Sequence, residues 1–214
     1  IVHLHNPKPG WFGRPAARAA RVPVVVNTVH GLYATPEDPW TRRAVVYGLE
    51  RVAAACSHAE LLQSVEDVEV LRRLGVPARR IQVLGNGVDL SRFSVPTVVE
   101  REAARSRLGL RPDQVAVGVV ARLVWEKGLA EVIEAATAMS STHPQVRWLV
   151  VGPLDSDKSD GLAPADLDRV SAESGITFLG ERSDVEDFYR ALDMYVLASH
   201  REGFPRSAME AAAS

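Results

Sequence analysis

The chain has 214 residues, of which 46% are hydrophobic and 24% are charged, an ordinary globular composition with enough length for one large domain or two small ones. A net charge of -2 and a pI near 6.3 exclude a general electrostatic case for nucleic-acid binding. Cys56 is the single cysteine, which excludes an intramolecular disulfide, and no apolar run approaches the roughly 20 residues that span a bilayer.

The first part of the chain alternates between strands and helices. Strands are predicted at 1–5, 22–28, 60–64 and 81–84, and helices at 10–21, 40–56 and 66–74. The run at 22–28 is rich in valine, which is typical of a strand buried on both faces. The helix over 40–56 is predicted to place Trp40, Ala44, Tyr47, Val52 and Cys56 on its apolar side.

A polar and broken stretch from about 90 to 113, with Pro96 and Pro112, is the candidate domain boundary. A second alternation follows it, with strands at 115–120, 146–152, 176–179 and 194–197 and helices at 128–140, 164–174 and 184–191. Two such runs predict an α/β protein with two Rossmann-like, doubly wound domains, residues 1–90 and 91–214. In that fold, ligands bind at the carboxyl ends of the strands.

The stretch from Glu202 to Glu210 changes character halfway. Gly203, Phe204 and Pro205 predict a tight loop, and strong helix formers follow from Ser207, a good N-cap residue. A helix that begins near Arg206 or Ser207 presents backbone N–H groups and a positive dipole end to the loop, which suits a phosphate. The two carboxylates can accept hydrogen bonds from sugar hydroxyls, so the pattern indicates a nucleotide-sugar site. The alternative is a loop followed by a surface helix with two solvated glutamates.

The loop after the strand at 115–120 carries a second anion-binding pattern. Arg122 and Lys127 flank it, and a helix opens at Gly128. Two cations beside a helix N-terminus suit a diphosphate, because Arg can grip it with two hydrogen bonds and Lys adds a point charge. An ordinary surface loop is the alternative. The chain has neither a G-x-G-x-x-G nor a G-x-x-x-x-G-K-[ST] motif, which disfavours dinucleotide and P-loop sites.

His30 follows the most apolar strand of the first domain, where it can bind a sugar hydroxyl, move a proton, or serve only as a structural strand-end residue. His3 and His5 share one face of their strand, but no third ligand at metal spacing lies nearby, so no metal site is expected. Asp155-Ser156-Asp157 has the form of a metal–diphosphate D-x-D motif, yet its polar surroundings favour a solvated loop.

Basic residues run along the helix predicted at 10–21 and just before it. Arg14, Arg18 and Arg21 are expected on one face, with Lys8, Trp11 and Phe12 close by. Such a face can contact an anionic membrane, but a plain solvated face is favoured, because charge runs usually only solvate a surface.

Taken together, the chain resembles the retaining glycosyltransferases of family 4, which have the two-Rossmann GT-B fold. The matching stretches, in the family's order, are His30-Gly31, Asn86–Asp89 with Arg92-Phe93, Ala121–Gly128, Phe178–Gly180 and Glu202–Glu210. The family's N-terminal glycine-rich loop and its last helices have no counterpart, so the chain is expected to be incomplete at both ends.

The resemblance implies roles for the matching positions. Arg122 and Lys127 would hold the donor diphosphate, Glu202 with Gly203–Pro205 the donor sugar, and Glu210 the ribose. Donor contacts would extend to Arg206 and Ser207, and the segment Glu181–Ser183, with Arg182 and Ser183 as donor-binding residues, would lie against the nucleobase. His30 would lie on the acceptor side, with His5 and Lys8 nearby, and residues 86–89 would connect the domains. No metal or other cofactor is implied.

The implied activity is transfer of a hexosyl unit, with retention, from a nucleotide sugar to a sugar or lipid-linked glycan in surface polysaccharide synthesis. A UDP-sugar is the expected donor, and the expected location is the cytoplasm, with possible peripheral contact at the inner face of the plasma membrane. Two alternatives stay open: a nucleotide-sugar binding fragment without catalysis, and a nucleotide-sugar epimerase of similar shape.

Overall fold

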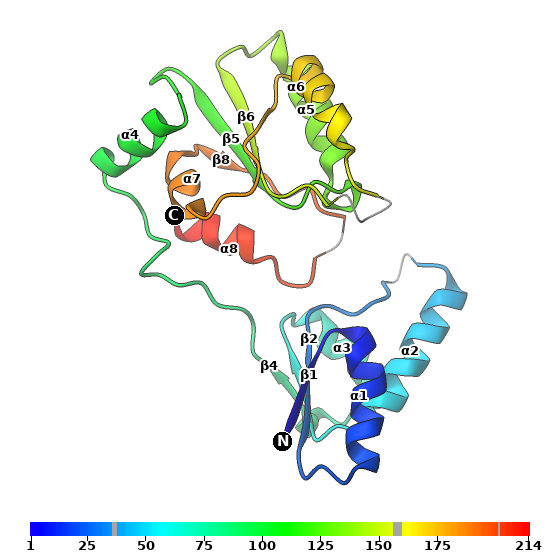
Figure 1. Ribbon diagram of the computed structural model, residues 1–214. Coiled ribbons are helices and arrows are strands. Elements are labelled where there is room, and N and C mark those ends of the chain that lie inside the picture. The colour runs from blue at the N-terminus through cyan, green and yellow to red at the C-terminus, as the bar shows by residue number, and fades with distance from the viewer. Residues whose placement is uncertain (36–37, 156–159, 201) are drawn as a thin grey trace. The chain divides into compact units, whose positions relative to one another are not determined.

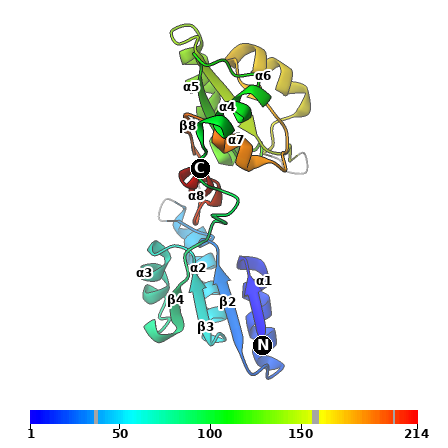
Figure 2. The ribbon, with the colours of Figure 1, turned by 90° about the vertical axis from the view of Figure 1, so that its left-hand side faces the viewer.

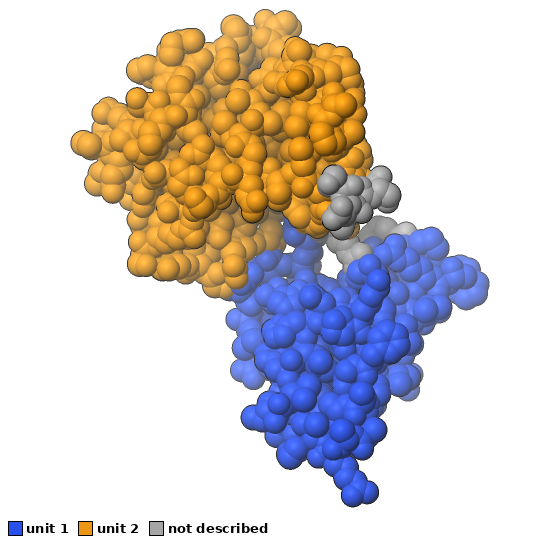
Figure 3. Space-filling model, viewed as in Figure 1, with its two compact units in different colours: residues 1–86, 202–204 blue, residues 87–201, 205–214 orange. Residues whose placement is uncertain are grey.

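The computed structural model describes residues 1–35, 38–155, 160–200 and 202–214. It divides into two compact units, Ile1–Asn86 with Glu202–Phe204, and Gly87–Arg201 with Pro205–Ser214, which Figure 3 colours separately. Each unit contains a four-stranded sheet in which the strands are parallel. The predicted α/β class with two Rossmann-like parts is confirmed.

The first unit has its strands in simple order, β1-β2-β3-β4. Its elements are β1 (Val2–His5), α1 (Pro7–Ala19), β2 (Val25–Val29), α2 (Trp40–Ala55), β3 (Ala59–Leu62), α3 (Glu66–Arg73), a 3₁₀ turn (Ala78–Arg80) and β4 (Ile81–Val83). Right-handed crossovers in one direction place successive helices on one face of the sheet. Figure 1 shows α1 and α2 together on that side, and Figure 2 shows β2, β3 and β4 side by side.

The core of the first unit lies between the sheet and its helices, where Val29, Leu62 and Leu71 are almost fully buried. The predicted apolar side of α2 is wrong, because Trp40 is 77% and Val52 is 64% exposed. The helix instead buries Val46, Glu50, Ala53 and Ala54. Small side chains allow close packing of the helix, and Glu50 is tolerated in the interior because it is paired with an arginine.

The second unit has the order β7-β6-β5-β8, so the chain first moves outward from β5 and then returns to its other side. Its elements are α4 (Val98–Arg107), β5 (Val115–Val120), a 3₁₀ turn (Trp125–Lys127), α5 (Leu129–Ser140), β6 (Val146–Val151), a 3₁₀ turn (Pro164–Asp166), α6 (Leu167–Ser174), β7 (Thr177–Phe178), α7 (Val185–Ala191), β8 (Met194–Tyr195) and α8 (Arg206–Ala213).

Both faces of the second sheet are covered. Val117 and Val119 of β5 belong to the core that includes Val132 of α5, whereas Ala116 belongs to a second core with Phe188 of α7. Successive side chains of a strand point to opposite faces, so α5 and α7 lie on opposite sides of β5. This unit is therefore doubly wound.

Helix α4 lies within the stretch from 90 to 113 that the sequence predicted to be broken, and that part of the prediction is wrong. A capping box starts it: the side chain of Thr97 accepts from the N–H of Glu100, and the Glu100 carboxylate accepts from the N–H of Thr97. Arg101 and Arg105 then bind the Asp193 carboxylate at 2.5 and 2.9 Å. Burial opposes ionisation of Asp193, but the N–H of Ala116 and these arginines lower its pKa overall.

Candidate functional site

The topology of the second sheet defines a candidate site between β5 and β8. The chain leaves β5 toward β6 on one side and returns to β8 on the other, which makes this pair the topological switch point. In open α/β sheets, ligands bind in the crevice beyond the carboxyl ends of the strands at that point. The loop that follows β5 carries Arg122 and Lys127, and the loop that follows β8 leads to α8. The sequence predicted an anion-binding pattern in each of these loops.

Gly128 allows these two loops to touch. It has φ +74° and ends the 3₁₀ turn that carries Lys127 at the start of α5. A Cβ at this position would lie 2.1 Å from the carbonyl oxygen of Ala198, in the loop after β8. The N–H of His200 also donates to the carbonyl of Glu126 at 3.1 Å. A side chain at position 128 would therefore push the two halves of the crevice apart.

Arg122 is 42% exposed and forms an ion pair with Asp155, which lies in the loop after β6. A bound diphosphate would have to compete with this carboxylate for the guanidinium group. Asp155 is the first residue of the D-x-D sequence, whereas Ser156 and Asp157 are outside the described residues. Within the described part of the chain, no cluster of three or more His, Cys, Asp or Glu side chains is arranged to hold a metal ion.

The N-terminus of α8 has the form expected of an anion site. The helix begins at Arg206 as predicted, and its N-cap residue, Pro205, provides no side-chain cap. The predicted cap at Ser207 is wrong, since its hydroxyl instead accepts from the Tyr195 hydroxyl at 2.8 Å. Among the described residues, neither Pro205 nor Ser207 caps the first turn, so its N–H groups are suited to a phosphate.

Glu210 lies one turn into α8 and lines an open pocket within the second unit. The lining residues are Gly87, Val88, Asp89, Arg92, Phe93, Arg206 and Glu210. The buried Tyr189 hydroxyl donates to Glu210 at 3.3 Å. The pKa of Tyr189 is raised by burial and by the neighbouring Tyr195 and Glu210, so this hydroxyl stays protonated and fixes the carboxylate as an acceptor.

Arg92 is a pocket residue to which the sequence assigned no role. Its guanidinium binds the Glu186 carboxylate at 2.6 Å and donates to the carbonyl of Ser183 at 2.7 Å. The sequence signal was present, because Arg92-Phe93 follows the matched Asn86–Asp89 stretch. The arginine connects the pocket that contains Glu210 to the segment expected beside the nucleobase.

The predicted nucleobase residues are held by local bonds. Arg182 makes two hydrogen bonds to the Asp184 carboxylate, at 3.0 and 2.6 Å, and the neighbouring carbonyl of Ser183 is taken by Arg92. Hydrogen bonding to Arg182, offset in part by desolvation, lowers the pKa of Asp184. These hydrogen bonds therefore hold the segment that contains Arg182, Ser183 and Asp184 in one conformation.

The predicted donor-sugar residues Glu202, Gly203 and Phe204 group with the first unit. Glu202 is exposed, and Phe204 is 39% exposed. The predicted site residues are thus divided: Arg122, Lys127, Arg182, Ser183, Pro205, Arg206, Ser207 and Glu210 belong to the second unit, and His5, Lys8, His30 and Glu202–Phe204 to the first.

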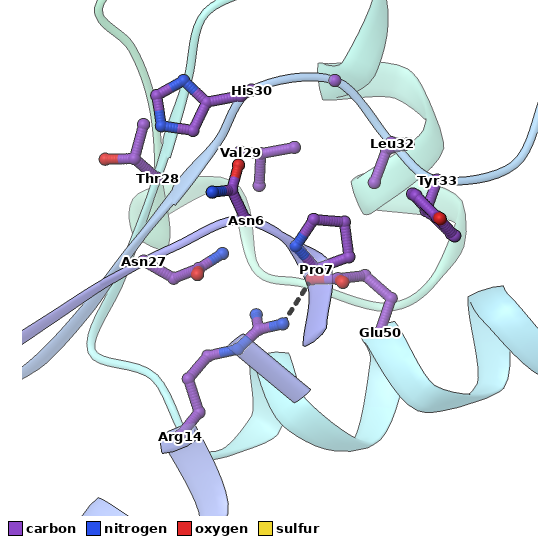
Figure 4. Close-up of a pocket in the computed structure, with 11 residues that line it drawn as sticks. Asn6, Pro7, Arg14, Asn27, Thr28, Val29, His30, Leu32, Tyr33 and Glu50 are labelled. Atoms are coloured by element: carbon purple, nitrogen blue, oxygen red, sulfur yellow. Dashed lines mark hydrogen bonds and ion pairs between the residues drawn. The ribbon is translucent and has the colours of Figure 1, made fainter. Parts of the chain in front are cut away.

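His30 lies at the rim of a small pocket in the first unit, shown in Figure 4. The pocket extends from Asn6 and His30 to Tyr33, and Arg14 and Glu50 form its floor. His5 Nδ1 lies 3.0 Å from His30 Nε2. Lys8 is exposed in the first turn of α1.

The predicted basic face of α1 is wrong, and Arg14 is the residue that shows it. Its side chain is fully buried and binds Glu50 at 2.8 Å and Glu60 at 2.9 Å. Burial raises the pKa of Glu60, against the lowering effect of Arg14. Arg21 lies beyond the last helical residue. The three arginines therefore do not form one exposed face, because two buried carboxylates draw Arg14 into the core.

Two family models match the chain. The model for glycosyl transferases group 1 matches residues 100–214, and the model for glycosyltransferase family 4 matches residues 1–92. The chain belongs to the group 1 glycosyltransferases. The identification of family and GT-B fold class from the sequence is confirmed.

Curated relatives match over almost the whole chain. The Escherichia coli UDP-Gal:alpha-D-GlcNAc-diphosphoundecaprenol alpha-1,3-galactosyltransferase is 32% identical, with 99% of this chain and 54% of that enzyme covered. The Campylobacter jejuni N,N'-diacetylbacillosaminyl-diphospho-undecaprenol alpha-1,3-N-acetylgalactosaminyltransferase is 28% identical, with 96% of this chain and 54% of that enzyme covered. The chain thus spans about half the length of these relatives.

Solved structures agree on the fold. Anabaena Alr3699/HepE in complex with UDP-glucose has a TM-score of 0.76 at 23% identity, covering 98% of this chain and 56% of that one. Sucrose-phosphate synthase from Thermosynechococcus elongatus has a TM-score of 0.74 at 23% identity, covering 98% of this chain and 53% of that one.

Proposed function

We propose that the protein transfers a hexosyl unit, with retention, from a UDP-sugar to a sugar or lipid-linked glycan acceptor in surface polysaccharide synthesis. The observation that carries the proposal is the switch point between β5 and β8, where a loop with two cations meets the loop that leads to an uncapped helix N-terminus. The UDP moiety and the lipid-linked acceptor are favoured by the donor and acceptor of the Escherichia coli relative, a galactosyltransferase that acts on GlcNAc-diphosphoundecaprenol.

Each predicted residue has a role in this proposal. Arg122, Lys127 and the first turn of α8 bind the donor diphosphate, Glu210 accepts from the ribose, and Arg182 and Ser183 border the nucleobase. Glu202 and the backbone of Gly203–Pro205 hold the donor sugar, with Arg206 and Ser207 at the helix start. His30, with His5 and Lys8, serves the acceptor side. No metal ion is required.

In the proposed reaction, the acceptor oxygen forms a bond to the anomeric carbon while the bond from that carbon to the phosphate oxygen breaks. The acceptor proton passes to the departing phosphate oxygen. Negative charge grows on the diphosphate as it leaves, so Arg122, Lys127 and the α8 dipole stabilise the transition state more than the ground state. Glu210 contributes to donor binding and not to this charge.

Two alternatives differ in their products. A nucleotide-sugar binding protein without catalysis would bind UDP through Glu210 but release no glycoside. An epimerase would convert the donor without an acceptor. The test is an assay of the complete protein with UDP-galactose and GlcNAc-diphosphoundecaprenol, with UDP-glucose and UDP-N-acetylglucosamine as further donors. Formation of an α-linked glycolipid supports transfer, whereas donor conversion without acceptor or binding without product supports one of the alternatives.

We also propose peripheral contact with an anionic membrane, through α2 in place of the predicted face of α1. Val45, Leu49 and Val52 are 62%, 40% and 64% exposed, and their spacing of four and three residues places them on one side of the helix. Arg42, which binds Asp38 at 2.8 Å, and Arg51 are exposed on this helix, whereas its single acidic residue, Glu50, is buried. Apolar side chains among cations suit the interface of an anionic bilayer.

Among the described residues, no helix is both long and apolar enough to cross a bilayer. The proposed location is the cytoplasmic face of the plasma membrane, with α2 as the proposed contact.

A further inference from the structure

Three imidazoles gather at the carboxyl ends of β1 and β2. His3 and His5 are two residues apart in β1 and so share one face of the sheet. The ring centroids of His3 and His5 are 4.3 Å apart, and those of His5 and His30 are 5.3 Å apart. Leu4, between the two histidines, faces α1, since a Cβ at Gly13 would lie 2.8 Å from its side chain. The imidazoles therefore lie on the face away from α1.

The contact between His5 and His30 is a direct hydrogen bond. His5 Nδ1 lies 3.0 Å from His30 Nε2, and one nitrogen must donate while the other accepts. If Nε2–H of His30 donates, both neutral rings carry their proton on Nε2, the commoner tautomer of a free histidine side chain. The opposite direction requires both rings to adopt the less common Nδ1–H form. The commoner tautomers thus favour His30 as the donor and His5 as the acceptor.

A hydrogen bond from His30 to His5 is kept when His30 is protonated but is lost when His5 is protonated. A proton added to Nδ1 of His30 leaves its Nε2–H in place as the donor. A proton added to Nδ1 of His5 removes the only acceptor. The pKa of His5 is lowered by burial and by the facing imidazoles of His3, on its own strand, and His30, after β2. The acceptor consequently persists at neutral pH and is lost as the solution is acidified.

We propose that His5 is a positioning residue for His30: it accepts the Nε2–H of His30, fixes the ring, and leaves His30 Nδ1 as the acceptor for a sugar hydroxyl. This inference rests on the acceptor-side role of His30 in the proposed function. It gives the two histidines different roles, since His5 acts through His30 and needs no contact of its own with the substrate.

The direct test is nitrogen-15 NMR of the complete protein labelled at histidine, at pH 8. In the wild type, His30 should give one protonated-type signal from Nε2 and one unprotonated-type signal from Nδ1. His5→Phe keeps a ring but removes the acceptor, and the two signals should move toward averaged positions. His5→Asn places an acceptor near the position of Nδ1 and should restore the separation. Unchanged His30 signals in His5→Phe would overturn the proposal.

Activity supplies a second readout, measured as transfer from UDP-galactose to GlcNAc-diphosphoundecaprenol. His5→Phe should lower kcat by roughly tenfold to 100-fold with little change in KM for the donor, because a loosely placed ring is seldom in its reactive position. His5→Asn should recover most of the loss, and its rate should no longer fall with the titration of an imidazole at position 5.

His3→Gln is the matched control. Its side chain can still reach Thr28, whose hydroxyl lies 2.8 Å from His3 Nε2, and it leaves the bond between His5 and His30 intact. It should retain near-normal kcat at pH 8. Equal losses in His3→Gln and His5→Phe would contradict a specific role for His5. If the wild type transfers no sugar at all, the proposed function fails, but the NMR experiment still decides the hydrogen bond.

Discussion

The two sheets of this protein differ in how their polar groups are used. In the first, the described strands follow one another in order, and its buried charges bind each other: Arg14 is enclosed by Glu50 and Glu60. In the second, the strand order reverses beside β5; one loop at that point carries Arg122 and Lys127, and the other leads to α8, whose N-cap residue provides no side-chain cap.

The difference separates structural charge from functional charge. A buried ion pair whose partners are both protein groups contributes to the fold but has little capacity left for a ligand. A half-exposed cation at a switch point can exchange its protein partner for a phosphate, as Arg122 would exchange Asp155. Four substitutions sharpen or break this comparison, from the largest expected effect to the smallest.

Removing the buried cation should have the largest effect. Arg14→Met leaves Glu50 and Glu60 without their common partner, and the free energy of unfolding should fall by about 3 to 5 kcal/mol. Urea denaturation of wild type and variant measures the loss. Because burial raises the pKa of Glu60, the folded state holds its proton to higher pH than the unfolded chain does, so ionisation destabilises the fold as the pH rises. The deficit of Arg14→Met should be larger at pH 8 than at pH 5.

A second substitution serves as the control for this loss. Glu60→Gln in the Arg14→Met background removes one uncompensated charge and should recover part of the stability while flattening its pH dependence. A pH-independent deficit that Glu60→Gln does not relieve would show that lost packing, and not buried charge, causes the effect.

Lys127→Ala should reduce turnover by about 100-fold or more, because the cation stabilises charge that develops on the leaving diphosphate. Initial rates of transfer from UDP-galactose measure it. Arg147→Ala is the control, since Arg147 is an exposed cation near the amino end of β6, away from the switch point. Wild-type turnover in Lys127→Ala would remove this lysine from the mechanism.

Gly128→Ala tests the contact between the loops after β5 and β8. Gly175 has φ +73°, nearly the same as the +74° of Gly128, but a Cβ there would meet nothing within 4 Å. Gly175→Ala should therefore cost only the strain of the left-handed conformation, about 1 to 2 kcal/mol. Gly128→Ala should cost about 2 kcal/mol more through its collision with Ala198. Equal denaturation midpoints for the two variants would contradict the close contact.

The smallest effect is expected at the membrane surface. Leu49→Glu places an acid on the exposed side of α2 and should weaken sedimentation with phosphatidylglycerol vesicles by about tenfold. Val95→Glu adds the same charge at an 81% exposed valine outside α2 and should bind nearly normally. Wild-type binding by both variants would exclude α2 as the contact. An equal loss of binding in both variants would indicate a nonspecific charge effect.

The sequence predicted the elements with clear patterns. The valine-rich strands and the start of α8 at Arg206 depend on local propensity and turn chemistry, which a single sequence contains. Both loops at the switch point were also predicted, since each directly follows a recognisable strand.

The missed features depend on tertiary partners. Helix α4 has a polar sequence and is held by arginines that bind Asp193, a residue more than 80 positions away. The buried face of α2 includes Glu50, which is tolerated in the interior because Arg14 forms an ion pair with it. Arg92 is held at the pocket by its hydrogen bonds to the carbonyl of Ser183 and the carboxylate of Glu186. Such pairings arise from the fold and leave no periodic signal in the sequence.

The central claim is that the crevice of the second unit binds a nucleoside diphosphate. The most direct measurement is a calorimetric titration of the complete protein with UDP, GDP and ADP in the absence of metal, repeated with Glu210→Ala and Lys127→Ala. The account predicts saturable binding of UDP that is weakened at least tenfold by either substitution. A folded protein that binds none of the three nucleotides, or binds UDP equally well without Glu210 and Lys127, would contradict it.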